Sequence, residues 1–159
     1  MKYRPLLLRS NRALGAALLN KSWVSVENLE AANTVLLEEM QKEQYSEANL
    51  LKILANKMKV LDEAGLLHTL ANEEHLPFAD LRIYETTVLA GFATDLELCR
   101  FTWTLPFNQR DNIWYVATAS YLSEPVRQKW EEVLHAPILW YLTSLQNVEE
   151  ALNALRIRK

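Results

Sequence analysis

The side chains that could carry catalysis or hold a ligand are few and scattered along the chain. The three glycines lie far apart and form neither a phosphate-binding loop nor a dinucleotide-binding fingerprint. His68 and His75 are seven residues apart and could share a helix face, but we do not expect four ligands to assemble near them into a tetrahedral metal site. Cys99 lies in an expected helix without a histidine partner, so we expect a buried, unreactive thiol. These residue types and spacings predict no catalytic centre and no metal site.

Adjacent glutamates add acidic groups without creating an acid–base pair. Neighbouring residues of a helix point in different directions, so we interpret these pairs as solvated helix faces. The pairs are Glu38-Glu39, Glu73-Glu74, Glu131-Glu132 and Glu149-Glu150.

Composition narrows the class of protein further. The 159 residues carry a net charge of −3 without a basic stripe, which argues against nucleic acid as a partner. The single cysteine fits a reducing compartment. No apolar run approaches the roughly 20 residues that span a bilayer, and the three leucines after Pro5 are too short a run for a signal peptide. We therefore expect a cytoplasmic protein without direct membrane insertion.

The second half of the sequence is expected to form a small three-stranded α/β lobe. Large apolar residues alternate with threonines from Phe101 onward, which is typical of a strand, and Pro106 places that strand at a sheet edge or at a bulge. The expected strands span 101–107, 113–120 and 138–143, and the expected helices span 123–135 and 144–155. The first two strands form an antiparallel hairpin, and a right-handed crossover makes the third parallel to the second.

Aromatic residues crowd this lobe, which holds four of the five tryptophans. Trp114-Tyr115 and Trp140-Tyr141 point to opposite faces of the expected sheet, so both faces need cover. We expect the lobe's two helices to cover only one face. The other face is covered either by the helical half or by a partner protein, and in the second case these four rings are interface residues. If they are all buried, the interface is expected around Trp23 in the helical half.

The first half is expected to be a weakly repeated helix–turn–helix. Residues 54–60 echo residues 18–24, and neither copy can bury its apolar stripe alone. Helices are expected to start at Ser10 or Asn11, at Ser25, at Ser46 and at Asp62, and a further one at Thr94 or Asp95. The sequence predicts an α+β fold with a helical lobe over 1–80, a linker over 81–94 and the α/β lobe over 95–159.

This order of segments resembles the N-terminal domain of the secretion and pilus traffic ATPases, the GspE/MshE N-terminal domain family. The resemblance rests on the order and spacing of segments from about Arg12 to Leu155. The segments are Leu-Pro-Phe-Ala-Asp-Leu (76–81), Thr-Leu-Pro-Phe (104–107), Val-Ala-Thr-Ala (116–119), the helix from Ser123, the strand 138–143 and Ser-Leu-Gln-Asn-Val-Glu-Glu-Ala-Leu (144–152). It implies a module that docks an ATPase onto an inner-membrane platform protein. The chain lacks the phosphate-binding loop of the ATPase motor itself.

One branch of that family binds cyclic di-GMP through two tandem helical motifs, and the resemblance aligns this chain with both. In the first copy Leu14, Gly15 and Leu29 are kept, while Arg12 stands one place before the expected arginine. Ser22 stands at the mid-turn glycine of the first copy, and Lys52 and Lys59 stand at the two glycines of the second. Most groups that would meet phosphates and guanines are absent, which argues against cyclic di-GMP binding. A cleft lined jointly by Arg12, Gly15 and Lys52 would instead indicate that the chain binds cyclic di-GMP.

The predicted function is therefore a non-catalytic docking or regulatory module of a bacterial secretion, pilus or envelope-export system, with no cofactor. The expected partner is a protein, either an inner-membrane platform protein or another secretion or pilus component, which could recruit the chain to the inner membrane. The alternative is a cyclic di-GMP sensor with degenerate ligand residues. A purely structural subunit is a third hypothesis that sequence alone does not separate from the first.

Overall fold

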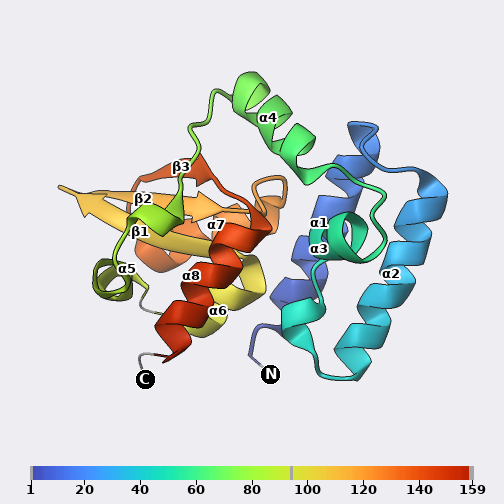
Figure 1. Cartoon of the computed structure of the whole chain (residues 1–159), viewed down its shortest axis with the longest axis horizontal. Coiled ribbons are helices and arrows are strands. Elements are labelled where there is room, and N and C mark those ends of the chain that lie inside the picture. Colours follow the sequence, from blue (N-terminus) through green and yellow to red (C-terminus); the bar gives the residue numbers. More distant parts are fainter. Residues whose placement is uncertain (1, 94, 158–159) are drawn as a thin grey trace.

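A helical half and an α/β half pack side by side in this chain (Figure 1). The structure is a computed structural model and describes residues 2–93 and 95–157. The helical half contains α1 (Arg4–Asn20), α2 (Val26–Gln41), the 3-10 turn η1 (Tyr45–Glu47), α3 (Leu50–Lys52), the π-helical turn η2 (Ile53–Lys57) and α4 (Glu63–Glu74). The α/β half contains the 3-10 turn η3 (Leu81–Ile83), α5 (Thr86–Phe92), α6 (Leu96–Thr102), β1 (Thr104–Arg110), β2 (Ile113–Thr118), α7 (Glu124–Leu134), β3 (Ile138–Leu142) and α8 (Leu145–Ile157). The predicted α+β class is confirmed.

The sheet has the predicted topology. Its order is β1-β2-β3, with β1 antiparallel and β3 parallel to β2. Pro106 lies on the edge strand β1, directly beside a bulge between Pro106 and Asn108. Both positions spare a proline from the ladder hydrogen bond that it cannot donate. Beyond β3, Leu142 exchanges backbone hydrogen bonds with Pro77 and Ala79, at 2.8 Å each, so the segment that leaves the helical half continues the sheet by one bridge.

The first strand begins later than predicted, because α6 continues to Thr102. Asp95 caps this helix by accepting the Leu98 N–H at 3.0 Å, as expected for one of its two possible caps, whereas Thr94 lies outside the described residues. Thr102 is buried, and its hydroxyl donates to the Leu98 carbonyl at 2.7 Å as in a helix. Trp103 then turns the chain in a left-handed conformation with φ 50°. The apolar alternation that begins at Phe101 therefore spans the end of α6 and the start of β1. The strand prediction was wrong for residues 101–103.

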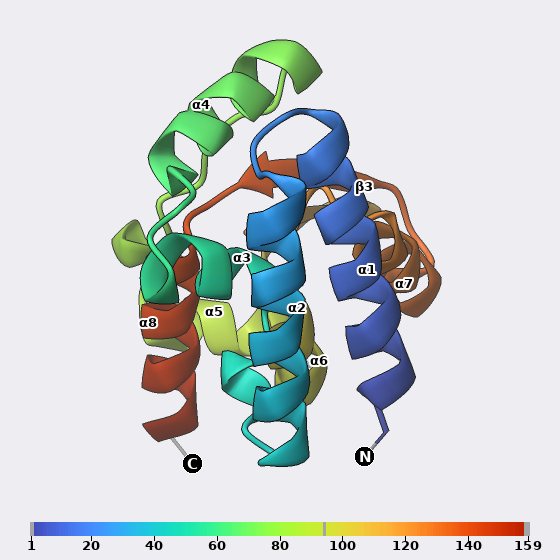
Figure 2. The same cartoon turned by 90° about the vertical axis from the view of Figure 1, so that its right-hand side faces the viewer.

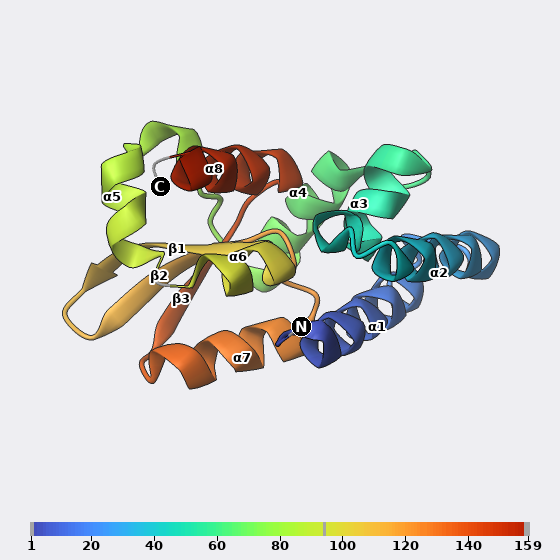
Figure 3. The ribbon, with the colours of Figure 1, turned by 90° about the horizontal axis from the view of Figure 1, so that it is seen from below.

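Helices cover both faces of the sheet, so the expectation that α7 and α8 share one face was wrong. Figure 3 shows α7 on one side of the sheet and α8 with α5 on the other. The crossover from β2 to β3 carries α7 over one face, and the chain after β3 returns over the opposite face. Trp130 of α7 is 1 % exposed and donates its Nε1–H to Thr102 Oγ1 at 3.0 Å. A buried indole needs such an acceptor, so Trp130 anchors α7 in the core as its helical spacing predicts.

Residues 81–93, expected to be a linker, contain η3 and α5. Leu81 and Leu89 of these elements are buried, and α5 packs against β1 and α8. Leu81 and Leu89 therefore belong to the core of the α/β half, whereas Ile83 and Val88 of the same segment are exposed. The division of the chain at residues 80 and 94 into two lobes stays a prediction.

The first helix starts at Arg4 and not at Ser10 or Asn11, because Pro5 suits its first turn. Asn11 is buried inside α1, where its amide nitrogen donates to the carbonyl oxygens of Leu7 at 2.9 Å and Ala48 at 3.1 Å. Its Oδ1 accepts the Leu50 N–H at 2.9 Å. Asn11, which the sequence suggested as a helix cap, therefore connects α1 to the start of α3 by hydrogen bonds. The third helix accordingly starts after Asn49, which caps it, and not at Ser46.

The turn before the capped helix has the same conformation in both helical repeats. Ser25 caps α2 and Asp62 caps α4 as predicted, each accepting a backbone N–H at 3.1 Å. Ser22 and Lys59 precede these caps by three residues, and both are left-handed, with φ 62° and 57°. Left-handed backbone favours glycine, the residue that the resembled motif has at both places. The left-handed turn therefore accounts for a glycine at these two mid-turn positions.

Glu63 connects the two halves by accepting the Leu145 N–H at the start of α8, at 2.9 Å. Burial raises the pKa of Glu63 above its ordinary value of 4.5, and the Leu145 N–H opposes this shift only in part. The folded protein therefore holds this proton more tightly than the unfolded chain does. Its stability should fall as the pH rises from about 4.5 through the raised pKa of Glu63.

We predict that Glu63→Gln removes this part of the pH dependence, because the amide oxygen still accepts the Leu145 N–H without carrying charge. Urea unfolding of both proteins across this pH range should show the wild type losing stability relative to Glu63→Gln as the pH rises. Glu74→Gln, an exposed change on the same helix, is the control. A wild type that gains stability relative to Glu63→Gln would contradict this account of the junction.

Candidate functional site

A groove between α1 and α2 brings together three of the residues singled out by the nucleotide-motif resemblance. The two helices run side by side (Figure 2), and Arg12, Gly15 and Leu29 line the groove between them. Its volume is about 430 Å³. The other lining residues are Leu8, Asn11, Ala16, Leu19, Asn33, Leu36 and Leu37. The groove is thus mainly apolar, with Arg12 at its edge as its one charged lining residue.

Gly15 has a packing reason to be a glycine. A Cβ placed on it would stand 2.9 Å from Leu50 Cδ2 and 3.1 Å from Leu29 Cδ1. Both distances are shorter than ordinary carbon contacts, so a larger residue would require the side chains of Leu50 and Leu29 to shift. This glycine is therefore accounted for without a ligand.

The remaining motif positions lie elsewhere. Leu14 is buried and lines a different, small internal cavity together with residues of α3 and α4. Lys52 lines different cavities from the one that holds Arg12 and Gly15. The structure therefore does not form the joint cleft of Arg12, Gly15 and Lys52 that would have indicated nucleotide binding.

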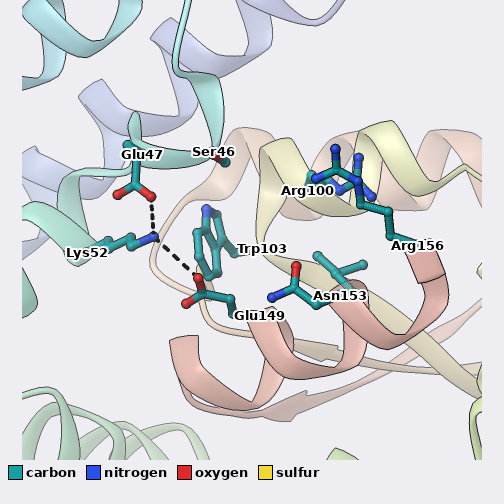
Figure 4. Close-up of a pocket in the computed structure, with 9 residues that line it drawn as sticks. Ser46, Glu47, Lys52, Arg100, Trp103, Glu149, Asn153 and Arg156 are labelled. Atoms are coloured by element: carbon teal, nitrogen blue, oxygen red, sulfur yellow. Dashed lines mark hydrogen bonds and ion pairs between the residues drawn. The ribbon is translucent and has the colours of Figure 1, made fainter.

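Lys52 belongs to a polar pocket where the two halves meet (Figure 4). Its ammonium group lies 3.0 Å from Glu47 and 3.8 Å from Glu149, and 5.2 Å from the centre of the Trp103 ring. The pocket has a volume of about 120 Å³. Its other lining residues are Ser46, Arg100, Leu152, Asn153 and Arg156. Sequence analysis missed this site, because its residues come from η1, α3, α6 and α8 and share no spacing.

The four aromatic rings predicted to be interface residues are all half-buried. Strand register places Trp114 and Trp140 on one face and Tyr115 and Tyr141 on the other. The two tyrosine rings stack with centroids 6.0 Å apart, and both rest edge-on against Phe107. Trp23 is also half-buried and lies against Gly65 at the start of α4.

Two exposed aliphatic side chains extend the tyrosine pair. Leu139 stands opposite Tyr115 in the ladder and is 49 % exposed, and Ile113 precedes Tyr115 by two residues and is 37 % exposed. The alternation of a strand places all four on the same side of the sheet. We call Ile113, Tyr115, Leu139 and Tyr141 the tyrosine face. Its apolar exposure is of the kind that marks protein interfaces.

The perturbed titratable groups have structural explanations. Burial, and then the hydrogen bond to Asp95, raise the pKa of Tyr3 to about 12. Cys99 is buried as the sequence predicted, and this burial strongly raises the pKa of its thiol, which disfavours the reactive thiolate. Within residues 2–93 and 95–157, no group of three or more histidine, cysteine and acidic side chains is placed to hold a metal ion. No helix in the described part of the chain is both long and apolar enough to cross a bilayer.

Comparison with known structures finds this fold in several solved chains, among them those of two proteins. The N-terminal domain of XpsE matches in two structures, each with a TM-score of 0.56 and 17 % identity; they cover 87 % and 91 % of this chain and 91 % and 94 % of that domain. A structure of MshE with c-di-GMP matches with a TM-score of 0.53 and 17 % identity, over 88 % of this chain and 96 % of that one. No family model and no curated protein sequence matches the chain. At this identity the likeness concerns the fold, and the resemblance predicted from the sequence is confirmed at that level.

Proposed function

We propose that this chain is a non-catalytic protein-docking module of a bacterial secretion or pilus system, held at the cytoplasmic side of the inner membrane by a platform protein. The observation that carries the proposal is the fold likeness to the XpsE N-terminal domain, which extends over 87–91 % of the chain. Domains of the family that the sequence resembles act by docking their ATPases onto such a platform. A docking role also agrees with a surface that offers exposed apolar side chains.

The tyrosine face is the surface that we assign to the platform protein. Interfaces draw most of their binding energy from a few aromatic and other large anchors surrounded by weaker contacts. Tyr115 and Tyr141 are held rigidly against Phe107 and against each other, so docking would order few additional side-chain rotamers. Leu139 adds an apolar side chain that is half-exposed in the free chain. Trp23, Trp114 and Trp140 remain secondary interface candidates.

We predict that Leu139→Arg weakens binding to the cytoplasmic domain of the platform protein from the same organism by at least about tenfold. A buried, unpaired guanidinium at the centre of an apolar contact is unfavourable. Isothermal titration calorimetry of the two purified proteins measures the effect. Leu139 is 49 % exposed in the free chain, so the substitution should leave its folding intact, as circular dichroism would verify.

Leu37→Arg is the matched control, because Leu37 is 54 % exposed and lies on α2, in the helical half. It should bind the platform domain as the wild type does. If Leu37→Arg abolishes binding and Leu139→Arg does not, the docking surface is the α1–α2 groove. If the wild type does not bind any platform domain of its own organism's secretion and pilus systems, the docking proposal itself is wrong.

Cyclic di-GMP binding is the alternative function, and the α1–α2 groove is the observation that favours it. The groove brings Arg12, Gly15 and Leu29 together. The chain that forms it shares its fold with the MshE structure that contains c-di-GMP. A cyclic dinucleotide carries two phosphates, which proteins usually meet with several charged or backbone donors. Arg12 is the one basic residue among the ten that line the groove, and Lys52 lines other pockets. The docking function therefore has the stronger support.

We predict no rise in the melting temperature with micromolar cyclic di-GMP, because a ligand that binds only the folded state must stabilise it. Differential scanning fluorimetry with and without the dinucleotide measures this. A rise of several degrees that disappears in Arg12→Gln would instead support the sensor function. Arg110→Gln, at the exposed end of the β1–β2 hairpin, is the control for a general loss of positive charge.

A further inference from the structure

The pocket of Figure 4 holds more positive than negative charge. Glu47 and Glu149 are both paired with Lys52, whose side chain is only 14 % exposed and whose charge lies against the Trp103 ring. Arg100 and Arg156 line the same pocket. Among the described residues, no carboxylate oxygen lies within 4.0 Å of either guanidinium group. Three cations and two carboxylates leave the pocket with one positive charge in excess, and the two arginines are the cations that have no carboxylate partner among the described residues.

Their positions on the helices do not explain why the two arginines share a pocket. Each lies in the last turn of its helix, α6 or α8, where a cation is favoured by the helix dipole. That preference could be met by pointing into solvent. Both side chains point toward the space between α6 and α8 (Figure 4), where like charges repel each other, although Arg156 also remains exposed to solvent. An anion bound between them would remove this repulsion.

The other pocket residues supply further hydrogen-bond donors. Asn153 can donate from its amide and Ser46 from its hydroxyl, and both line the pocket beside the arginines. Glu149, Asn153 and Arg156 recur along one side of α8, which directs them toward the same space. Trp103 forms a wall of the pocket from a left-handed backbone position that few bulky residues adopt. Burial of Trp103 and of most of the Lys52 side chain holds this part of the pocket in place, whereas the polar lining side chains of α8 are more exposed.

We propose that this pocket binds the phosphate group of a small phosphorylated molecule or of inorganic phosphate. Guanidinium groups recognise phosphate through paired, charge-assisted hydrogen bonds, and a phosphate offers enough oxygen atoms for two arginines and the neighbouring amide and hydroxyl donors. A volume of about 120 Å³ holds several water molecules and accommodates a phosphate group, but it does not enclose a nucleotide. Because η1, α6 and α8 all contribute, the bound anion would bridge the helical half and the α/β half.

The indole N–H of Trp103 gives a local readout of this site. The chain has five tryptophans, so the ¹⁵N–¹H spectrum has a small set of indole signals, and Trp103→Phe identifies the relevant one. Titration with inorganic phosphate, with chloride used to keep the ionic strength constant, should shift that signal in a saturable way. Glycerol 3-phosphate should do the same, and the tighter of the two ligands tells whether the free ion or a phosphate monoester is the preferred form. Acetate at the same concentration should not saturate the site.

Arg156→Gln should weaken phosphate binding by about tenfold or more. Arg156 is exposed, so this substitution should leave the fold intact, whereas Arg100 is half-buried and Arg100→Gln serves as the second variant. Arg110→Gln, on the distant hairpin, should bind phosphate as the wild type does. The proposal is overturned if the Trp103 signal shows no saturable shift, if acetate binds as tightly as phosphate, or if Arg156→Gln and Arg110→Gln have the same affinity as the wild type.

Discussion

The junction between the two halves is the constraint on which the rest of the structure depends. It is built from polar groups that would be costly to leave unpaired. Leu142 shares backbone hydrogen bonds with Pro77 and Ala79, Glu63 accepts the first N–H of α8, and α1 packs against α7. Tyr3, at the start of α1, donates to Asp95, which also caps α6. Apolar burial alone would tolerate sliding of one half over the other, whereas these directional bonds fix their relative position.

Two surfaces with different chemistry have different positions relative to this junction: the polar pocket of Lys52 and Trp103, and the tyrosine face. The Lys52–Trp103 pocket lies at the junction and takes residues from both halves, so a ligand there would strengthen or loosen their contact. The four residues of the tyrosine face come from β2 and β3, and Phe107 of β1 contacts both tyrosine rings. A protein could therefore bind the tyrosine face while an anion occupies the pocket, because the two sites share no residues. The apolar α1–α2 groove is a third surface, explained in part by the close approach of Leu29 and Leu50 to Gly15.

The sequence predicted those features that local chemistry specifies. The caps at Ser25 and Asp62, the hairpin, the bulge at Pro106 and the parallel third strand all follow from short-range signals. The start of α1 was mispredicted because the partners of Asn11 at Ala48 and Leu50 are far away in sequence. The pocket was missed for the same reason, since Lys52, Trp103 and Arg156 share no periodicity. Only the packing of α3, α6 and α8 brings those three side chains together.

Native-state amide hydrogen exchange tests most directly whether the two halves form one cooperative unit. Informative amides are those of Leu50, bonded to Asn11 in the helical half, Leu145, bonded to Glu63 at the junction, and Thr143, bonded to Thr118 in the sheet. We predict that all three exchange with the same free energy of opening, equal to that of global unfolding. If Leu50 exchanges with a markedly lower free energy than Thr143, the halves open independently, and the junction does not hold the structure as described.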